Sequence, residues 1–174
     1  MWFQMRQVDL DFLENAPRIH VVGCDVALPR EVVWNAVIDP PTWSDWFPGV
    51  RSASYRGDPP YGVGTIRIAD VGGYLMEETM LAWDDGRRWA YRIDRATVPL
   101  AKAQLEATEL AYQGSGTRVR WTLASDPGIL LRVTAPFFQS TVQRLLERAM
   151  RNLEAREASR DSSGRPAPFR EVHG

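Results

Sequence analysis

Two glutamates, Glu78 and Glu106, are the residues of this sequence whose type and placement could do chemistry. Each lies in a segment of alternating apolar residues, YLMEETMLAW for Glu78 and AKAQLEATELAY for Glu106, on the side that the alternation predicts to be buried. A carboxylate on an apolar surface loses hydration, and its pKa tends to rise. Such a group could act as a general acid or base, or it could orient the polar part of a ligand.

A structural role is the competing interpretation of these carboxylates. Each could lie near a strand end, where water reaches it, or could meet a buried arginine such as Arg67. With two strand spacings between them, the carboxylates are expected on the order of 10 Å apart. That distance is too long for sharing a proton, but it would suit two ends of one polar group.

Other chemical signals are weak. His20 and His173 are the only histidines and Cys24 is the only cysteine, so a histidine-based metal site or triad has few residues available, and an internal disulfide has none. The segment Gly62-Val63-Gly64 lacks the third glycine of a nucleotide-binding fingerprint, because Arg67 occupies that position. We predict no metal and no cofactor, and we interpret Cys24 as a small strand residue.

The composition is that of one globular domain. The chain has 174 residues, 44% apolar and 25% charged, with a net charge of -1. This balance gives no electrostatic reason to expect a nucleic acid or a strongly anionic membrane as partner. The sequence contains no apolar run of about 18 residues and no apolar signal-peptide core, so we expect a cytoplasmic protein without integral membrane association.

The elements that would position the glutamates are strands. A first strand, Arg18 to Leu28, runs into a helix start at Pro29. Alternation with regularly spaced turn signals then predicts a meander of six further strands: Arg51–Arg56, Gly64–Ala69, Tyr74–Trp83, Arg88–Arg95, Lys102–Tyr112 and Thr117–Ser125.

Helices are expected on both sides of this meander. Two short ones, Pro29–Ile38 and Thr42–Trp46, are separated by Asp39-Pro40-Pro41, because proline interrupts a helix. Pro136 opens the longest helical pattern. Its apolar face carries five residues: Phe138, Val142, Leu145, Ala149 and Leu153.

These elements divide the chain into three parts. We predict an N-terminal extension over residues 1–17, one domain over 18–158, and a disordered polar tail over 159–174. A sheet with one buried face needs a cover, and the last helix is long enough to provide it.

The order of elements and several local motifs resemble the START-like, or SRPBCC, superfamily of polyketide cyclase/dehydrase and lipid-transport proteins. The motifs are ALPREVVWNAVIDPPTWSDWFPGV, YGVGTIR and MEETMLAW. The resemblance covers about Arg18 to Glu157 and implies the α+β helix-grip fold. In this fold a curved seven-stranded antiparallel sheet surrounds a long C-terminal helix, and two short helices follow the first strand. It also implies a cavity for a hydrophobic small molecule.

Hairpin register predicts which side chains would face that cavity. A two-residue turn at Asp85-Gly86 would pair Ala82 with Trp89, Met80 with Tyr91 and Glu78 with Ile93. Either turn at Gly114–Gly116 keeps Glu106 and Trp121 on one face. The predicted ligand-binding residues are Tyr74, Met76, Glu78, Met80, Trp89, Tyr91, Glu106, Thr108, Trp121, Phe138, Val142 and Leu145.

The aromatic residues between the two short helices have two interpretations. Trp43 and Trp46 either complete the core at one end of the sheet or form the entrance of the cavity. The prolines around them forbid one continuous helix.

Three functions follow as hypotheses. The first is a protein that binds one hydrophobic small molecule of lipid, polyketide or isoprenoid type. The second is a cyclase/dehydratase-type enzyme in which Glu78 or Glu106 moves protons. The third is a protein-interaction module that uses Trp2, Phe3 and the Trp43 segment. The sequence predicts no particular oligomeric state.

Overall fold

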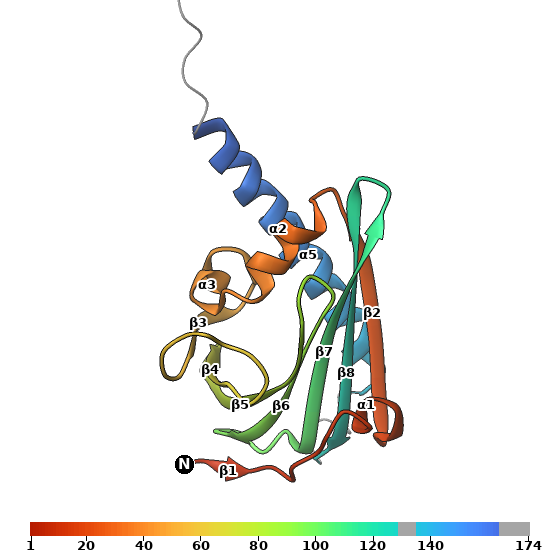
Figure 1. Ribbon diagram of the computed structural model, residues 1–174. Coiled ribbons are helices and arrows are strands. Elements are labelled where there is room, and N and C mark those ends of the chain that lie inside the picture. The colour runs from red at the N-terminus through yellow and green to blue at the C-terminus, as the bar shows by residue number, and fades with distance from the viewer. Residues whose placement is uncertain (129–134, 164–174) are drawn as a thin grey trace, which may run out of the picture.

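The computed structural model describes residues 1–128 and 135–163, and it places side chains for 1–128 and 138–160. Its main element is one antiparallel sheet with the strand order β2-β8-β7-β6-β5-β4-β3, to which β1 adds at β6. Figure 1 shows this sheet curving, with the last helix behind it and the short helices that follow β2 at its upper end. The predicted α+β helix-grip architecture is confirmed.

The strands follow the expected meander. The predicted strands agree with the observed ones to within a few residues at each end. The observed bounds are β1 Phe3–Gln4, β2 Arg18–Val26, β3 Val50–Tyr55, β4 Ile66–Val71, β5 Tyr74–Asp84, β6 Arg88–Ala96, β7 Ala101–Gln113 and β8 Gly116–Pro127.

The helices lie where the prolines and the apolar pattern place them. The sequence after β2 forms α2 (Arg30–Val37), η1 (Pro40–Thr42) and α3 (Trp43–Trp46), and the chain ends in α5 (Ala135–Ser163). A further short helix, α1 (Phe12–Asn15), precedes β2. The main apolar core lies between α5, the short helices and the inner face of the sheet. No helix among the described residues has the length and hydropathy to cross a bilayer.

The hairpin between β5 and β6 departs from the predicted register on both sides of the Glu78–Met80 stretch. Asp84 pairs with Arg88, so the turn has three residues instead of two, and Glu77 pairs with Arg95. Met80 pairs with Tyr91 and Glu78 with Ile93, as expected, but Ala82 pairs with Ala90 instead of Trp89. A β-bulge between Met80 and Ala82 causes the difference, because one extra residue reverses the facing of everything beyond it. Ala82 therefore belongs to an outer cluster with Ala90 and Ala107.

The hairpin between β7 and β8 keeps its predicted register. Its turn is Gly114-Ser115, since Gln113 pairs with Gly116. Glu106 therefore pairs with Leu123, and Thr108 pairs with Trp121. Gly114 has a φ of 60°, a conformation that glycine adopts without a steric penalty.

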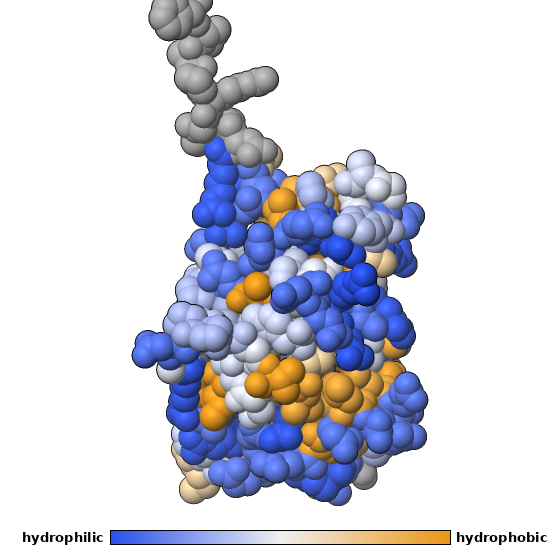
Figure 2. Space-filling view, viewed as in Figure 1, coloured by the Kyte–Doolittle hydropathy of each residue, from blue (hydrophilic) through white to orange (hydrophobic). Residues whose placement is uncertain are grey.

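The N-terminal segment covers two parts of the sheet. β1 pairs with the last two residues of β6, and Met5 packs on the inner cluster with Met76 and Ile93. The chain then crosses to the outer face, where Phe12 packs on Ala103 and Leu105. In Figure 2 an apolar patch lies over the lower part of this face, near α1.

The last helix is longer than predicted. We expected the chain to leave helical structure at Ser159, but α5 continues to Ser163. The hydroxyl of Ser159 donates to the Ala155 carbonyl at 2.8 Å, a bond that keeps the side chain within the helix. The rest of the predicted tail, 164–174, lies outside the described residues, as does His173.

Candidate functional site

A small aromatic cavity lies between α3, α5 and the inner face of β6, β7 and β8. Its volume is about 50 Å³. Six of its lining residues are aromatic, and Thr108 is the one with an aliphatic hydroxyl. The lining consists of Val37, Trp43, Trp46, Phe47, Trp89, Tyr91, Thr108, Val119, Trp121, Leu146 and Met150.

Alternation along the strands and the tight α3 turn bring these rings together. Trp89 and Tyr91 both face inward from β6, with ring centroids 4.9 Å apart. Trp43 meets Trp89 edge-on at 5.6 Å, and Phe47 meets Trp121 edge-on at 5.9 Å. Edge-to-face contacts at these distances are favourable, so the rings support one another.

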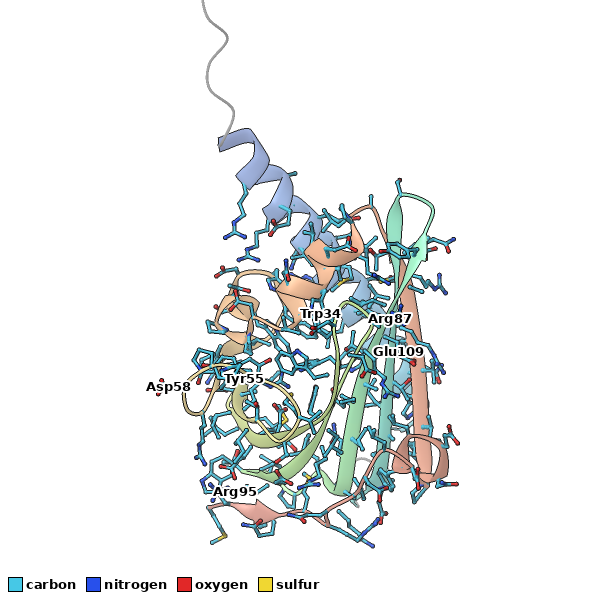
Figure 3. All side chains as sticks on the ribbon, viewed as in Figure 1. Trp34, Tyr55, Asp58, Arg87, Arg95 and Glu109 are labelled. Atoms are coloured by element: carbon cyan, nitrogen blue, oxygen red, sulfur yellow. The ribbon has the colours of Figure 1, made fainter. Side chains whose placement is uncertain are left out.

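A second aromatic group lies on the α2 side of the cavity. Trp34 on α2 and Tyr55 on β3 both contact Trp83, with centroids 6.3 and 5.8 Å from it. Figure 3 shows Trp34 and Tyr55 toward the interior and Arg87 and Glu109 at the hairpin end of the sheet.

A buried ion pair lies directly beneath the cavity rings. The Arg67 Nε donates to Glu78 Oε2 at 2.5 Å, and both side chains are 1% exposed. The Arg67 guanidinium also contacts three rings that line the cavity. Its Cζ is 4.4 Å from the Trp43 ring centroid, 4.5 Å from that of Trp89 and 4.3 Å from that of Tyr91. Cation–π contacts of this kind strengthen when water is absent.

Burial and the charges of the ion pair shift the pKa values of Glu78, Arg67 and Tyr91. Burial raises the pKa of Glu78 above its ordinary value, and the Arg67 guanidinium opposes the rise. Burial alone would lower the pKa of Arg67, but the Glu78 carboxylate, together with Tyr91 and Tyr55, raises that pKa above its ordinary value. Burial, followed by the Glu106 carboxylate, raises the pKa of Tyr91 well above its ordinary value. Tyr91 is therefore a neutral hydrogen-bond donor at physiological pH.

The second glutamate, Glu106, is held by neutral donors. Tyr91 donates its hydroxyl to Oε2 at 2.5 Å, and Trp121 donates its indole N–H to the same atom at 3.1 Å. Gln104 donates to Oε1 at 2.6 Å. Glu106 accepts all three bonds and fixes two of the cavity rings in place. Among the described residues it forms no ion pair.

The structure brings six of the predicted site residues to the cavity and leaves the others elsewhere. Those that line it are Trp43, Trp46, Trp89, Tyr91, Thr108 and Trp121. Glu78 and Glu106 lie behind these rings and do not line the cavity. Met80 and Val142 are buried in the same core, and Phe138 packs against it.

Three predicted residues lie away from the cavity. Tyr74 and Met76 belong to the lower inner cluster around Met5. Leu145 is only half-buried, and Leu146 takes the lining position on α5. The reason is helical phase, because the buried stripe runs through Val142, Leu146, Ala149 and Leu153, and 145 lies beside it.

Several lining residues were not among those predicted. Leu146 and Met150 are four residues apart, so a helix periodicity anchored at Val142 would have found them. Val37 ends α2 and faces the same core. Arg67 was considered only as a partner for a glutamate, and no sequence signal places its guanidinium among three rings.

Among the residues that the structure describes, the remaining reactive side chains form no second centre. Cys24 is half-buried, and burial raises the pKa of its thiol to about 11, so the nucleophilic thiolate is scarce. His20 lies on β2 beside the Phe138 ring, 4.9 Å between centroids. Within residues 1–128 and 135–163, no three His, Cys, Asp or Glu side chains gather in a way that could hold a metal ion.

Comparison with known proteins identifies the family. The family described as polyketide cyclase / dehydrase and lipid transport matches residues 20–157. This chain belongs to it. The match begins within β2 and ends within α5, so the family covers both the sheet and the cavity. The residues before β2 lie outside the match.

Other proteins resemble this chain in sequence or in fold. An uncharacterized protein of Mycobacterium tuberculosis (strain ATCC 25618 / H37Rv) is 26% identical over 152 residues, 87% of this chain and 91% of that protein. Ginseng major latex-like protein 151 from Panax ginseng has a TM-score of 0.66 at 14% identity, covering 80% of this chain and 96% of that one. A START superfamily protein from Mycobacterium smegmatis has a TM-score of 0.65 at 14% identity, covering 81% of this chain and 97% of that one. These structures share the fold.

Proposed function

We propose that this family member binds one hydrophobic small molecule, of lipid, polyketide or isoprenoid type, at the aromatic cavity. The supporting observation is the lining itself, in which aromatic and aliphatic side chains from five elements converge around a single threonine hydroxyl. Ligand sites are typically lined in this way, with few polar groups that fix orientation. Family membership supports the same function.

Binding requires that one wall of the cavity move outward. Its volume of about 50 Å³ is well below the roughly 300–1,000 Å³ of sites for drug-sized ligands. The segment Trp43–Phe47 is the wall that we expect to move, because α3 has only four residues and follows two prolines. We propose that Trp46 and Phe47 swing away to admit the ligand, which is the entrance role considered for Trp43 and Trp46.

The other two hypotheses have less support. Glu78 is sealed by its arginine, and Glu106 already accepts three hydrogen bonds, so neither meets the cavity as an acid or base. The Trp43 segment is buried, whereas a docking surface for another protein needs exposed rings. Trp2 and Phe3 are 38% and 37% exposed, but Trp2 packs on the Arg95 guanidinium.

Filling the cavity tests the proposal. Thr108→Phe places a ring inside it, and Thr122→Phe places the same ring on the outer face near Leu10 and Leu13. Native mass spectrometry of each protein, purified from its own host, should show a bound apolar molecule in wild type and in Thr122→Phe but not in Thr108→Phe. Added back at about 100 times its Kd, that molecule should raise the Tm of wild type by roughly 5–10 °C. Equal occupancy of all three proteins would contradict binding at this cavity.

A further inference from the structure

Some buried hydrogen-bond donors around the cavity lack an acceptor. Arg67 Nη1 and the indole Nε1 of Trp46 are buried, yet neither has a hydrogen-bond acceptor among the described residues. Both are donors. A buried donor without an acceptor is costly, and such groups are rare in native proteins. A ligand that supplies a hydrogen-bond acceptor would therefore satisfy these donors.

The strongest of these donors is Arg67. Its side chain is 1% exposed, and its Nε is already committed to Glu78. The guanidinium contacts the rings of Trp43, Trp89 and Tyr91, all three of which line the cavity. These contacts hold the guanidinium in place, and Nη1 has no acceptor among the described residues. A donor in this position is prepared for an oxygen that enters among the rings.

The charges nearby decide what kind of oxygen fits. Glu78 neutralises Arg67, and Glu106 brings a second carboxylate that no cation balances among the described residues. A ligand carboxylate would therefore enter an interior that already carries net negative charge, at a high desolvation cost. A neutral carbonyl oxygen accepts the same hydrogen bond without this repulsion.

We propose that Arg67 Nη1 anchors a neutral acceptor oxygen, such as that of a ketone, ester or quinone, of an otherwise apolar ligand. This inference rests on the proposed function of the cavity and names the class of molecule. Arg67 acts as a binding residue, Glu78 positions it through Nε, and the three rings hold the guanidinium plane. The Trp46 indole N–H offers a further donor at the cavity.

Three probes of similar shape separate these requirements. 2-Acetylnaphthalene carries a neutral ketone, 2-isopropylnaphthalene replaces the carbonyl by hydrocarbon, and 2-naphthoate carries an anion. Calorimetric titration of wild type at pH 7 should show the ketone binding about tenfold or more tightly than the hydrocarbon, as expected for a hydrogen bond from a charged donor. The naphthoate should bind at least tenfold more weakly than the ketone.

A double variant tests whether Arg67 causes this preference. Arg67→Met with Glu78→Met removes the ion pair together, so no charge is left buried alone. The hydrocarbon should bind it within about twofold of wild type, and the ketone should lose its advantage. The infrared carbonyl stretch of the bound ketone should lie at lower wavenumber in wild type than in the double variant.

The outcomes separate this inference from the function on which it rests. If no probe binds wild type, both proposals are overturned. If ketone and hydrocarbon bind wild type equally, or the double variant keeps the ketone preference, only the role of Arg67 is overturned. Tightest binding by 2-naphthoate would overturn the neutral acceptor.

Discussion

At the residue scale, the main feature of the interior is the buried Arg67–Glu78 ion pair. Both side chains are almost completely buried, and the guanidinium contacts three rings of the core. Two charges removed from water have a desolvation cost that their attraction only partly offsets. The pair is therefore a weak source of stability as a unit, although each partner depends strongly on the other.

Breaking the pair should be far more harmful than removing it. Arg67→Met alone leaves the Glu78 carboxylate buried without a cation and should lower the free energy of unfolding by about 3–5 kcal/mol. Adding Glu78→Met should recover most of that loss, since both charges are then gone. Urea unfolding at pH 7, followed by tryptophan fluorescence, measures all three proteins. A double variant no more stable than Arg67→Met would contradict the account.

The sequence predicted part of this residue-scale picture. Alternation placed Glu78 and Glu106 on the inner face, and Arg67 was recognised as a possible partner. The sequence could not place the guanidinium among Trp43, Trp89 and Tyr91. Those rings come from two elements whose packing is set by tertiary contacts. Alternation gives a side of a strand and no distance across the core.

At the element scale, one bulge and one segment decide where prediction from sequence stops. Strand order and most of the register follow from turn signals and family resemblance. The bulge near Leu81 leaves no local signal, since neither glycine nor proline marks it, yet it turns Ala82 outward and Trp83 inward. Part of the outer face is buried, because the N-terminal segment covers its small side chains.

The N-terminal segment should contribute through Phe12. This ring is 8% exposed and packs on Ala103, Leu105 and Ala124. Phe12→Ala should lower the free energy of unfolding by about 3 kcal/mol, as expected for a large buried side chain. Phe3→Ala is the matched control, because Phe3 is 37% exposed and should cost below about 1 kcal/mol. Equal losses measured by urea unfolding would show that the segment does not anchor through Phe12.

At the scale of the whole molecule, the short α3 segment and the long α5 helix close the cavity together. Asn152 on α5 donates its side-chain amide to the Trp46 carbonyl at 3.0 Å, and Arg156 lies 3.7 Å from Asp45. These contacts join residues more than 100 positions apart. The covering wall thus depends on the docking of the last helix, which prediction of separate elements could not reveal.

Loosening this connection should speed ligand exchange without altering the cavity lining. Asn152→Ala removes the hydrogen bond to Trp46 and lowers the barrier to outward movement of α3, so association and dissociation of 2-acetylnaphthalene should both accelerate several-fold. Its Kd should change by less than about threefold, because the residues that contact the ligand are unchanged. Stopped-flow quenching of tryptophan emission measures both rates. Arg148→Ala, an exposed change on the same helix, should leave both rates at wild-type values. If Asn152→Ala also leaves them unchanged, the ligand enters by a route that does not require α3 to move.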